Sequence, residues 1–150
     1  MGSDEDPSGD EDRRLREPTR QARGFERVRA AHQREVAEDY VELIADLIDV
    51  TGEARSVDLA ERLGVTSATV NATLNRLIRE GLVQRERYRS VFLTEAGRAL
   101  AEHSRERHRV VRSFLLKIGV DAETAETDAE GIEHHISATT LAALRRFTDE

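Results

Sequence analysis

The sequence predicts a mostly α-helical protein that contains one small β-hairpin. Apolar residues recur every three or four positions through most of the chain after residue 24, which is the spacing of a buried helix face. Glycines at positions 64, 81 and 119 follow such stretches and favour helix ends. The segment "LVQRERYRSVFLT", residues 82–94, alternates at the strand period on both sides of a break near 87–89, which predicts the hairpin.

Length and composition limit the size of the core. A chain of 150 residues that is 38% hydrophobic and 4% aromatic can form one domain, or one domain with an arm, around a modest aliphatic core. Such a protein often completes its core by pairing with a second copy. The absence of cysteine excludes disulfides, zinc knuckles and thiolate-bound metals. No apolar run approaches the about 20 residues of a membrane span, and the N-terminus has no signal-peptide core, so we expect a cytoplasmic protein that does not bind membranes.

Residues 1–23 are predicted to form a disordered acidic arm. They contain Pro7 and Pro18 and very few residues that could be buried, and residues 1–12 hold six acids and no lysine or arginine. A helix is expected to begin near Phe25 and to end near Val50, before Thr51-Gly52. Its second half places a set of apolar side chains on one face: Val41, Ile44, Leu47 and Ile48.

Two short helices and the hairpin follow. Ser56 can cap the helix "VDLAERLG", and Thr66 or Ser67 can cap the helix "ATVNATLNRLIREG", with the turn at Gly64 between them. The second helix has its own apolar face, formed by Val70, Leu74, Leu77 and Ile78. A short helix, a glycine turn, a second helix and a hairpin together predict a winged helix-turn-helix over residues 24–94.

This arrangement favours binding to DNA. In a winged helix-turn-helix the second helix enters the major groove, and asparagine can bridge N6 and N7 of adenine. The base-contact candidates are Ser67, Thr69, Asn71 and Thr73, and the candidates for phosphate or minor-groove contacts are Arg76, Arg79, Arg85, Arg87 and Arg89. Residues 55–98 carry eight arginines and five acids, so the net charge of −7 conceals a mildly basic middle. The alternative is a helix-turn-helix that contacts only protein and whose arginines are solvated.

Residues 95–150 are predicted to form a helical domain. Thr94 caps a long helix that reaches about Ile118. Asp121 then opens a helix that continues to His134 or His135, and Ser137 caps the last helix. The last helix has an apolar stripe suited to a dimer interface: Leu141, Leu144 and Phe147.

Imidazoles and carboxylates are concentrated in the segment "DAEGIEHHIS", residues 128–137. On a helix Glu130, Glu133 and His134 share one face, whereas His135 points about 100° further round. The short turn at Gly119 makes the flanking helices antiparallel, so His108, eleven residues before it, lies level with Glu130, eleven residues after it. These donors suit Mn(II) or Fe(II) and accept Zn(II) or Co(II). A solvated polar face that carries histidines is the alternative.

The segments "VDLAERLGVTSATVNATLNRL", "VFLTEAGRALAEHSRERH" and "DAEGIEHHIS" closely resemble the manganese transport regulators, a branch of the diphtheria toxin repressor superfamily. The resemblance covers roughly residues 25–148. It implies an N-terminal winged-helix domain, a helical dimerisation domain over 95–150, and manganese bound between them. It also implies that the loaded homodimer binds double-stranded operator DNA and represses manganese-uptake genes, with no enzymatic activity.

The resemblance implies a set of metal ligands that spacing alone does not give. Asp39 and Glu42, which by spacing alone indicate a solvated face, are ligands in the implied set. The whole set is Asp39, Glu42, His108, Glu130, Glu133 and His134. Members of this family form a two-metal site with bridging carboxylates, so Mn(II), with two ions per subunit, is expected. Iron-responsive relatives have cysteine where Glu130 stands, which favours manganese over iron.

Three other functions compete with a manganese-dependent repressor. The chain could be a winged-helix regulator that responds to iron or zinc, or one that senses an organic ligand. A two-metal hydrolase is the rival from another class, since binuclear carboxylate sites activate water. The sequence offers this hydrolase no general base outside the ligand set. In the predicted recognition helix, positions 72 and 75 are alanine and asparagine where relatives often have lysine, which leaves the operator sequence open.

Overall fold

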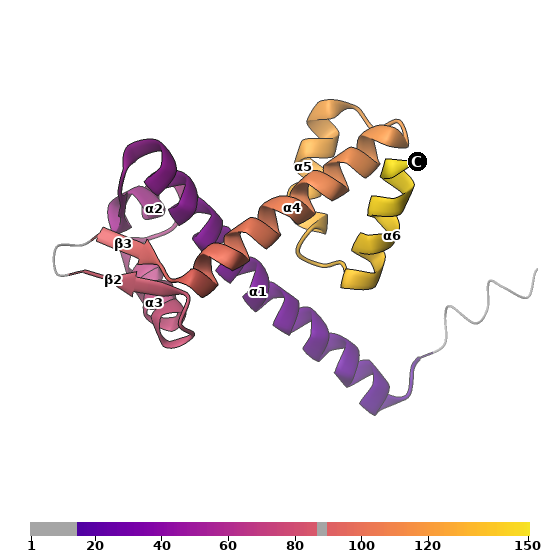
Figure 1. Cartoon of the computed structure of the whole chain (residues 1–150). Coiled ribbons are helices and arrows are strands. Elements are labelled where there is room, and N and C mark those ends of the chain that lie inside the picture. Colours follow the sequence, from indigo (N-terminus) through magenta and orange to yellow (C-terminus); the bar gives the residue numbers. More distant parts are fainter. Residues whose placement is uncertain (1–14, 87–89) are drawn as a thin grey trace, which may run out of the picture.

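The computed structural model describes residues 15–86 and 90–150. In Figure 1 a small body containing the sheet lies at one end of the molecule, and α4 runs from it to two further helices. The elements are α1 (Pro18–Thr51), β1 (Ala54–Arg55), α2 (Ser56–Leu63), α3 (Ser67–Arg79), β2 (Val83–Arg85), β3 (Ser90–Leu93), α4 (Glu95–Lys117), α5 (Ala122–Ile132) and α6 (Ala138–Asp149). The predicted class, mostly helical with a small hairpin, is confirmed.

The first helix begins seven residues earlier than the sequence pattern predicts. Pro18 occupies its first turn, and the Glu17 carboxylate accepts hydrogen bonds from the backbone N–H groups of Thr19 and Arg20, both at 3.1 Å. Residues 18–23, which we expected in the acidic arm, are therefore helical, because a proline that breaks a helix interior is well placed at a helix start. Of the rest of that predicted arm, residues 15–17 are described and not helical, and residues 1–14 lie outside the described residues.

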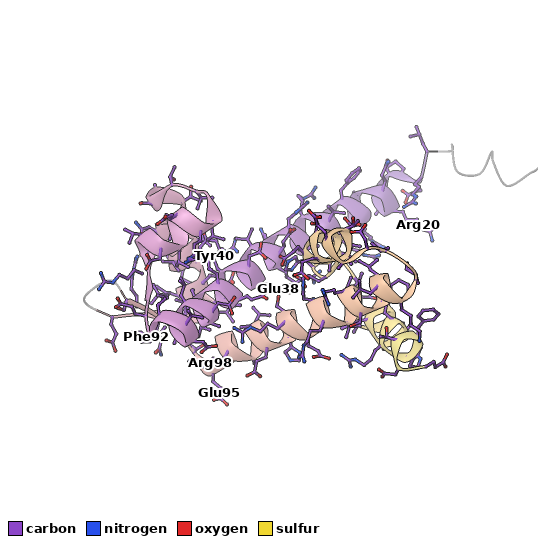
Figure 2. All side chains as sticks on the ribbon, turned by 90° about the horizontal axis from the view of Figure 1, so that it is seen from above. Arg20, Glu38, Tyr40, Phe92, Glu95 and Arg98 are labelled. Atoms are coloured by element: carbon purple, nitrogen blue, oxygen red, sulfur yellow. The ribbon has the colours of Figure 1, made fainter. Side chains whose placement is uncertain are left out.

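Only the second half of α1 packs closely against the body. Val41 and Ile44 are completely buried, whereas Phe25 is 58% exposed. The first half extends away from the body toward the N-terminus, with Arg20 near its outer end and Glu38 where α1 faces the C-terminal helices (Figures 1 and 2). A helix of this length therefore reaches both parts of the molecule.

The predicted helix-turn-helix forms with one change at its start. Gly64 adopts φ 68° and ends α2, and the Thr66 hydroxyl accepts a hydrogen bond from the Thr69 N–H at 3.1 Å, which caps α3. Ser56, expected to cap α2, is instead its first helical residue, and Arg55 holds the N-cap position without a side-chain hydrogen bond. The reason is a short extra strand, β1, which holds Ala54 and Arg55 in the sheet.

The three strands form an antiparallel sheet in the order β1-β3-β2. In the predicted hairpin, Val83 pairs with Leu93 and Arg85 with Val91. Its buried side chains pack with those of α1, α2 and α3 in one core cluster, whose fully buried members include Ile44, Leu59, Val70, Leu74, Leu77 and Val91. Two of the arginines predicted for the wing, Arg87 and Arg89, fall in the segment outside the described residues.

Helix α4 leaves the sheet at a close backbone contact. A Cβ on Gly97 would lie 2.1 Å from the Leu82 carbonyl oxygen, so only glycine fits there. The Thr94 hydroxyl accepts from the Gly97 N–H at 3.1 Å and donates to the Gly81 carbonyl at 2.6 Å. This cap fixes the direction in which α4 leaves the winged-helix body.

The C-terminal helices surround a second, smaller core. Asp121 and Ser137 cap α5 and α6 as predicted. Helix α5 ends at Ile132 rather than at His134 or His135, so Glu133 and His134 lie in the turn that follows. The core consists of Val111, Leu115, Ala125 and Ala129, with Leu141 and Leu144 of α6 partly buried against it. No residue of α6 is fully buried, and Phe147 is 45% exposed.

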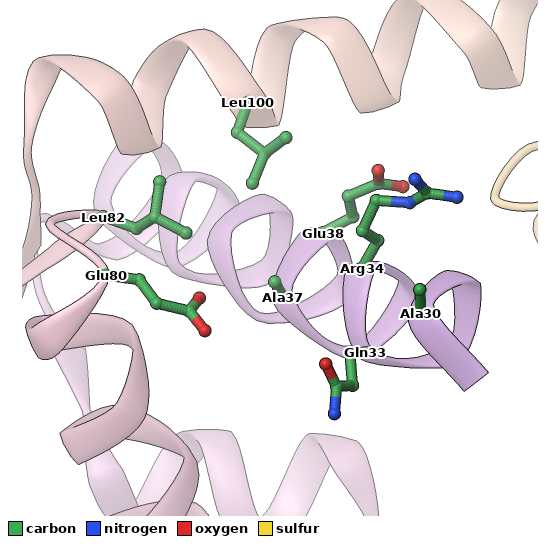
Figure 3. A pocket seen from close by; sticks show the side chains of 8 residues that line it. All are labelled: Ala30, Gln33, Arg34, Ala37, Glu38, Glu80, Leu82 and Leu100. Atoms are coloured by element: carbon green, nitrogen blue, oxygen red, sulfur yellow. The ribbon is translucent and has the colours of Figure 1, made fainter. Parts of the chain in front are cut away.

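A cavity of about 330 Å³ lies between α1, α4 and the segment that follows α3 (Figure 3). It is lined by Ala30, Gln33, Arg34, Ala37, Glu38, Glu80, Leu82 and Leu100. Its volume is at the low end of the range for organic-ligand sites, about 300–1,000 Å³, and it contains none of the aromatic side chains common in such sites. Within the described part of the chain, no helix is long and apolar enough to span a membrane.

Candidate metal centre and nucleic-acid interface

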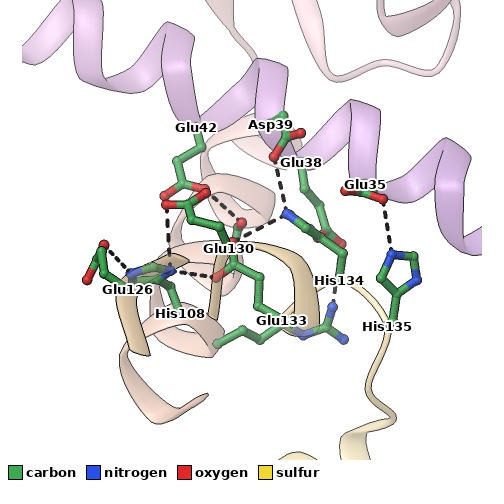
Figure 4. A network of polar contacts seen from close by, with 12 residues as sticks. Glu35, Glu38, Asp39, Glu42, His108, Glu126, Glu130, Glu133, His134 and His135 are labelled. Carbon is green, nitrogen blue, oxygen red and sulfur yellow. Dashed lines mark hydrogen bonds and ion pairs between the residues drawn. The ribbon is translucent and has the colours of Figure 1, made fainter. Parts of the chain in front are cut away.

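Six side chains from three parts of the chain meet between α1, α4 and the end of α5 (Figure 4). They are the six that the family resemblance implies: Asp39 and Glu42 of α1, His108 of α4, Glu130 of α5, and Glu133 and His134 of the following turn. Residues almost a hundred positions apart thus share one site. The antiparallel pairing of α4 and α5 and the crossing of α1 over both produce this convergence.

His108 lies where the antiparallel geometry predicts. Its Nδ1 atom is 3.9 Å from Glu130 Oε1 and 3.1 Å from Glu133 Oε2. Its Nε2 atom is 2.8 Å from Glu126 Oε1. The His108 side chain is 16% exposed, so the imidazole is enclosed by carboxylates on both sides rather than solvated.

His134 is the most enclosed member of the site, with a side chain only 1% exposed. Its Nε2 atom lies 3.2 Å from Asp39 Oδ1 and 3.3 Å from Glu133 Oε1. Its Nδ1 atom lies 2.6 Å from Glu38 Oε2. One ring nitrogen therefore faces the other candidate ligands, while the second is held by a carboxylate behind it.

Asp39 and Glu42 differ from what their spacing alone indicates. Asp39 is partly exposed, but its carboxylate points at His134, and Glu42 accepts a hydrogen bond from the Ser104 hydroxyl at 2.9 Å. Both therefore direct a carboxylate at the site, although 42% of the Asp39 side chain stays exposed. Spacing within one helix could not reveal this, because the partners lie on α4 and after α5.

The site also contains two acids that sequence reasoning missed, Glu38 and Glu126. Glu38 is 4% exposed and accepts from Arg107 Nη1 at 3.5 Å, besides its contact with His134. Its position three residues before Val41, on the buried face of α1, is the signal that could have found it. Glu126 lies one helical turn before Glu130 and contacts both His108 and Arg112.

Burial raises the affinity of two of the carboxylates, Glu133 and Glu42, for protons. Desolvation raises the pKa of Glu133 to about 7, although the imidazoles of His108 and His134 oppose that shift. Desolvation also raises the pKa of Glu42, against the effect of the Ser104 hydrogen bond. A buried carboxylate of this kind favours either a proton or a bound cation.

The histidines bind protons more strongly as well. Burial alone would lower the pKa of His134, but hydrogen bonds with Asp39 and Glu38 outweigh it and raise the pKa to about 10. Burial also opposes the shift at His108, whose pKa is nevertheless raised by the charge of Glu133 and the contact with Glu126. In the metal-free protein, protons therefore offset the clustered negative charge, and a divalent cation would replace them.

The donor set fits a divalent cation of intermediate hardness. It offers carboxylate oxygens and imidazole nitrogens and no sulfur, which suits Mn(II) and Fe(II) and does not exclude Zn(II) or Co(II). Among the described residues, the donor atoms of Glu35, Asp39 and His134 all lie within 4.8 Å of one another, as do those of His108, Glu126 and Glu130. Two groups of donors side by side could hold more than one ion.

The structure describes seven of the nine predicted DNA-contact residues, which lie on α3 and at the end of β2. Ser67, Thr69 and Asn71 are exposed on the first turns of α3, and Thr73 is half-buried. Arg79 is exposed as well, but Arg76 donates to the Gln33 carbonyl of α1 at 3.3 Å and is thus held against α1.

Arg85 links the wing to α3. Its Nη2 atom donates to Asn71 Oδ1 at 2.8 Å and to Ser56 Oγ at 2.7 Å. Asn71, the side chain best suited to contact adenine, is therefore held by Arg85 of the hairpin, and both side chains are exposed.

Comparison with known families agrees with this architecture. Residues 33–91 match the family described as the iron dependent repressor, N-terminal DNA binding domain. Residues 94–150 match the iron dependent repressor, metal binding and dimerisation domain. The two matches meet at the start of α4, where the structure passes from the winged-helix body to the helices that carry His108 and the following donors.

Curated relatives match this chain at identities from 40% to 55%. The "Transcriptional regulator MntR" of Escherichia coli is 55% identical over 127 residues, which are 85% of this chain and 82% of that protein. The "HTH-type transcriptional regulator MntR" of Lysinibacillus sphaericus is 41% identical over 100 residues, or 67% of this chain and 72% of the relative.

Solved structures resemble the fold. A "Manganese-dependent transcriptional repressor complex with manganese" has a TM-score of 0.68 and 29% identity, covering 75% of this chain and 52% of the other. The "manganese regulator SloR" has a TM-score of 0.67 and 26% identity, covering 75% and 53%. The chain thus spans about half the length of these solved relatives. With both family domains matched in order, the chain belongs to the iron-dependent repressor family of transcriptional regulators, the diphtheria toxin repressor family.

Proposed function

We propose that this protein is a manganese-activated transcriptional repressor that binds double-stranded operator DNA as a homodimer. The observation that carries the proposal is the convergence of six oxygen and nitrogen donors from α1, α4 and the end of α5. Two structurally similar proteins are named a manganese regulator and a manganese-dependent repressor, which supports manganese as the metal. The glutamate at position 130, rather than a thiolate, agrees with a hard, oxygen-rich site.

The ligands we propose are Asp39, Glu42, His108, Glu130, Glu133 and His134, arranged around two ions per subunit. Support for two ions comes from two pairs of proposed ligands whose donor atoms lie close together, Asp39 with His134 and His108 with Glu130. Bound Mn(II) would supply the positive charge and the coordination positions that four carboxylates in one small site require. Without it, these carboxylates repel one another unless protons bind.

The site connects the two parts of the molecule. Asp39 and Glu42 belong to the same helix as Val41 and Ile44, which are buried in the winged-helix core. The other four proposed ligands lie on α4, on α5 and in the turn after α5. Drawing these groups together fixes α1, and with it α3, relative to the dimerisation helices, so that both DNA-binding domains of a dimer stand at a fixed spacing.

Fixed spacing matters because a dimer must reach two half-sites at once. If the DNA-binding domains are already aligned, less conformational entropy is lost on binding. A coupling free energy of about 1–3 kcal/mol between metal and DNA corresponds to about 5–150-fold in operator affinity. On the DNA side we propose Ser67, Thr69, Asn71 and Thr73 for base edges and Arg79 and Arg85 for phosphates. Arg87 and Arg89, outside the described residues, stay predictions, and we propose that Arg76, which is held against α1, acts through that helix.

The test is operator binding with and without Mn(II) for Glu130→Ala. The duplex can be selected from a random library with the manganese-loaded protein and then used in fluorescence anisotropy titrations. We expect Mn(II) to tighten binding of the unaltered protein at least about fivefold, and to have no such effect on Glu130→Ala. Glu123→Ala, at the other end of α5, is the control and should respond like the unaltered protein. An unchanged manganese response in Glu130→Ala would remove this site from the mechanism.

A further inference from the structure

A second group of potential metal ligands lies on the surface beside the site described above. His32 and Glu35 lie on α1, and His135 lies in the turn after α5. One donor atom from each of the three lies within 4.8 Å of the other two. His135 Nε2 is 3.1 Å from Glu35 Oε2, and His32 Nδ1 is 3.4 Å from the same oxygen. The two rings meet edge to face, with centroids 5.5 Å apart.

None of these three residues belongs to the proposed manganese ligands, although a Glu35 oxygen also lies within 4.8 Å of donor atoms of Asp39 and His134. His135 and His134 are neighbours in the chain, but the His134 side chain is 1% exposed and the His135 side chain is 38% exposed. In Figure 4 the pair Glu35 and His135 stands at the edge of the network, apart from the carboxylates around His108. An ion could therefore reach this group from solvent without entering the buried site.

An ordinary surface ion pair is the simplest description of one histidine beside one glutamate. Here, however, two imidazoles from segments about a hundred residues apart direct a ring nitrogen at the same carboxylate oxygen. Two histidines and one carboxylate that converge, with room for water on the exposed side, form the usual protein part of a transition-metal site. His32, Glu35 and His135, with one donor atom each within 4.8 Å of the others, supply this set of ligands.

We propose that His32, Glu35 and His135 form a separate surface site for a divalent transition metal, and that it prefers Zn(II) to Mn(II). Two imidazoles and few oxygens favour the later metals of the divalent series. Zn(II) also accepts three protein ligands and one water in a tetrahedral arrangement. The oxygen-rich buried site and this nitrogen-rich surface site thus suit different metals in the same subunit.

A metal at this surface site would tie together the same two elements that the buried site joins. Glu35 lies one helical turn before Asp39, and His135 follows His134 directly. Zinc bound here would hold the N-terminal half of α1 against the turn after α5. The inference does not depend on the proposed repressor function, because zinc binding at the surface can be measured without DNA.

Equilibrium dialysis with Zn(II) on the full chain tests the proposal. The test variant carries His32→Ala together with His135→Ala, and the control carries His103→Ala, an exposed histidine of α4 outside either site. The double histidine variant and the control are also made in a protein that carries Glu130→Ala and Glu133→Ala, so that zinc bound at the buried site does not contribute to the measured stoichiometry. We expect the double histidine variant to bind one zinc fewer per chain than the control in both backgrounds.

Two further measurements distinguish ligation from a general loss of structure. Glu35→Gln keeps the shape of the side chain and should weaken zinc binding at this site at least about tenfold, because even groups outside the first coordination shell contribute that much. Co(II), used as a probe for Zn(II), should give the intense visible absorption of tetrahedral cobalt in the control and not in the double variant. Equal zinc stoichiometry, or equal cobalt spectra, in the double variant and the control would overturn the proposal. Failure of Mn(II) to control DNA binding would overturn only the repressor function.

Discussion

At the scale of single residues, Glu38 lies where it can orient His134, one of the proposed metal ligands. It is 4% exposed, and its Oε2 atom lies 2.6 Å from His134 Nδ1, which leaves His134 Nε2 free to face Asp39 and Glu133. A carboxylate behind a ligating histidine fixes its tautomer and ring orientation. Glu38 is therefore a positioning residue for the proposed site.

We expect Glu38→Gln to weaken Mn(II) binding by about 10–100-fold, the usual effect of removing such a partner. Glu26→Gln, on the exposed first half of α1, is the matched control and should leave the affinity unchanged. Isothermal titration with Mn(II) measures both. If Glu38→Gln binds Mn(II) like the control, the hydrogen bond to His134 does not support the site.

The raised pKa values of Glu133 and His134 make a prediction about pH. A group with a raised pKa in the folded protein stabilises the fold fully below its unfolded pKa, and this contribution is lost as the pH rises through the folded pKa. For Glu133 this window runs from about 4.5 to about 7, and for His134 from about 6.5 to about 10. In chelator, the protein should therefore lose stability as the pH rises from 5 to 9.

Glu133→Gln isolates the first part of that window, because glutamine resembles the protonated acid. In chelator the variant should unfold at a higher temperature than the unaltered protein at pH 8, and the difference should vanish near pH 5. Thermal melts followed by circular dichroism at both pH values measure this difference. Identical melts at pH 8 would show that Glu133 has an ordinary pKa.

At the scale of elements, two helical glycines differ in the space around them, so replacing each by alanine should change the stability of the fold in opposite directions. Gly97→Ala would place a methyl group 2.1 Å from the Leu82 carbonyl, a backbone atom that cannot move aside easily. Gly131, inside α5, has nothing within 4 Å of its would-be Cβ. We expect Gly97→Ala to lower the free energy of unfolding by about 1–3 kcal/mol, as other overpacked sites do.

Gly131→Ala should instead raise the free energy of unfolding by about 0.5–1 kcal/mol, since alanine is the better helix former. Urea unfolding of the two variants beside the unaltered protein gives both values. A destabilised Gly131→Ala would show that α5 needs a flexible position before the turn that carries Glu133.

Much of the fold could be predicted from the sequence, because its signals are local. Thr66, Thr94, Asp121 and Ser137 each cap the helix expected of them. The start of α1 was placed too late, because Glu17 and Pro18 begin a helix whose first half has no buried face to reveal it. The end of α5 was placed too late, because the pattern of donors continues into a turn that is not helical.

The candidate site is only partly predictable, because part of it depends on contacts between segments that are distant in the sequence. The level of His108 with Glu130 follows from two helices joined by a short turn, so chain geometry sufficed. The orientation of Asp39 and Glu42 toward the site depends on how α1 packs against the C-terminal helices. The spacing of residues within α1 carries no information about that packing. Only the resemblance to a known family indicated these two residues.

At the scale of the whole molecule, α6 indicates where a second subunit binds. It has no fully buried residue, and Phe147 packs edge to face on Phe114 yet stays 45% exposed. Ile118 and Ile132, also at this end of the molecule, are 53% and 39% exposed. Exposed apolar side chains in a domain matched as a dimerisation domain favour α6 as part of the interface.

Phe147→Asp should therefore weaken the dimer at least about tenfold, which corresponds to about 1.4 kcal/mol. Val50→Asp is the control, because Val50 is 84% exposed at the end of α1 that belongs to the winged-helix body. Sedimentation velocity over a concentration series measures the monomer–dimer equilibrium. An unaltered equilibrium in Phe147→Asp would place the interface elsewhere.

The course of α1 has a practical consequence for anyone who dissects this protein. Because the helix supplies Asp39 and Glu42 while its apolar face fills the winged-helix core, cutting the chain after Leu93 would leave two of the proposed donors on one fragment and four on the other. Neither piece would inherit a complete set. We therefore expect each fragment, whether made by proteolysis or fused to another protein, to lose the response to manganese even if it folds alone.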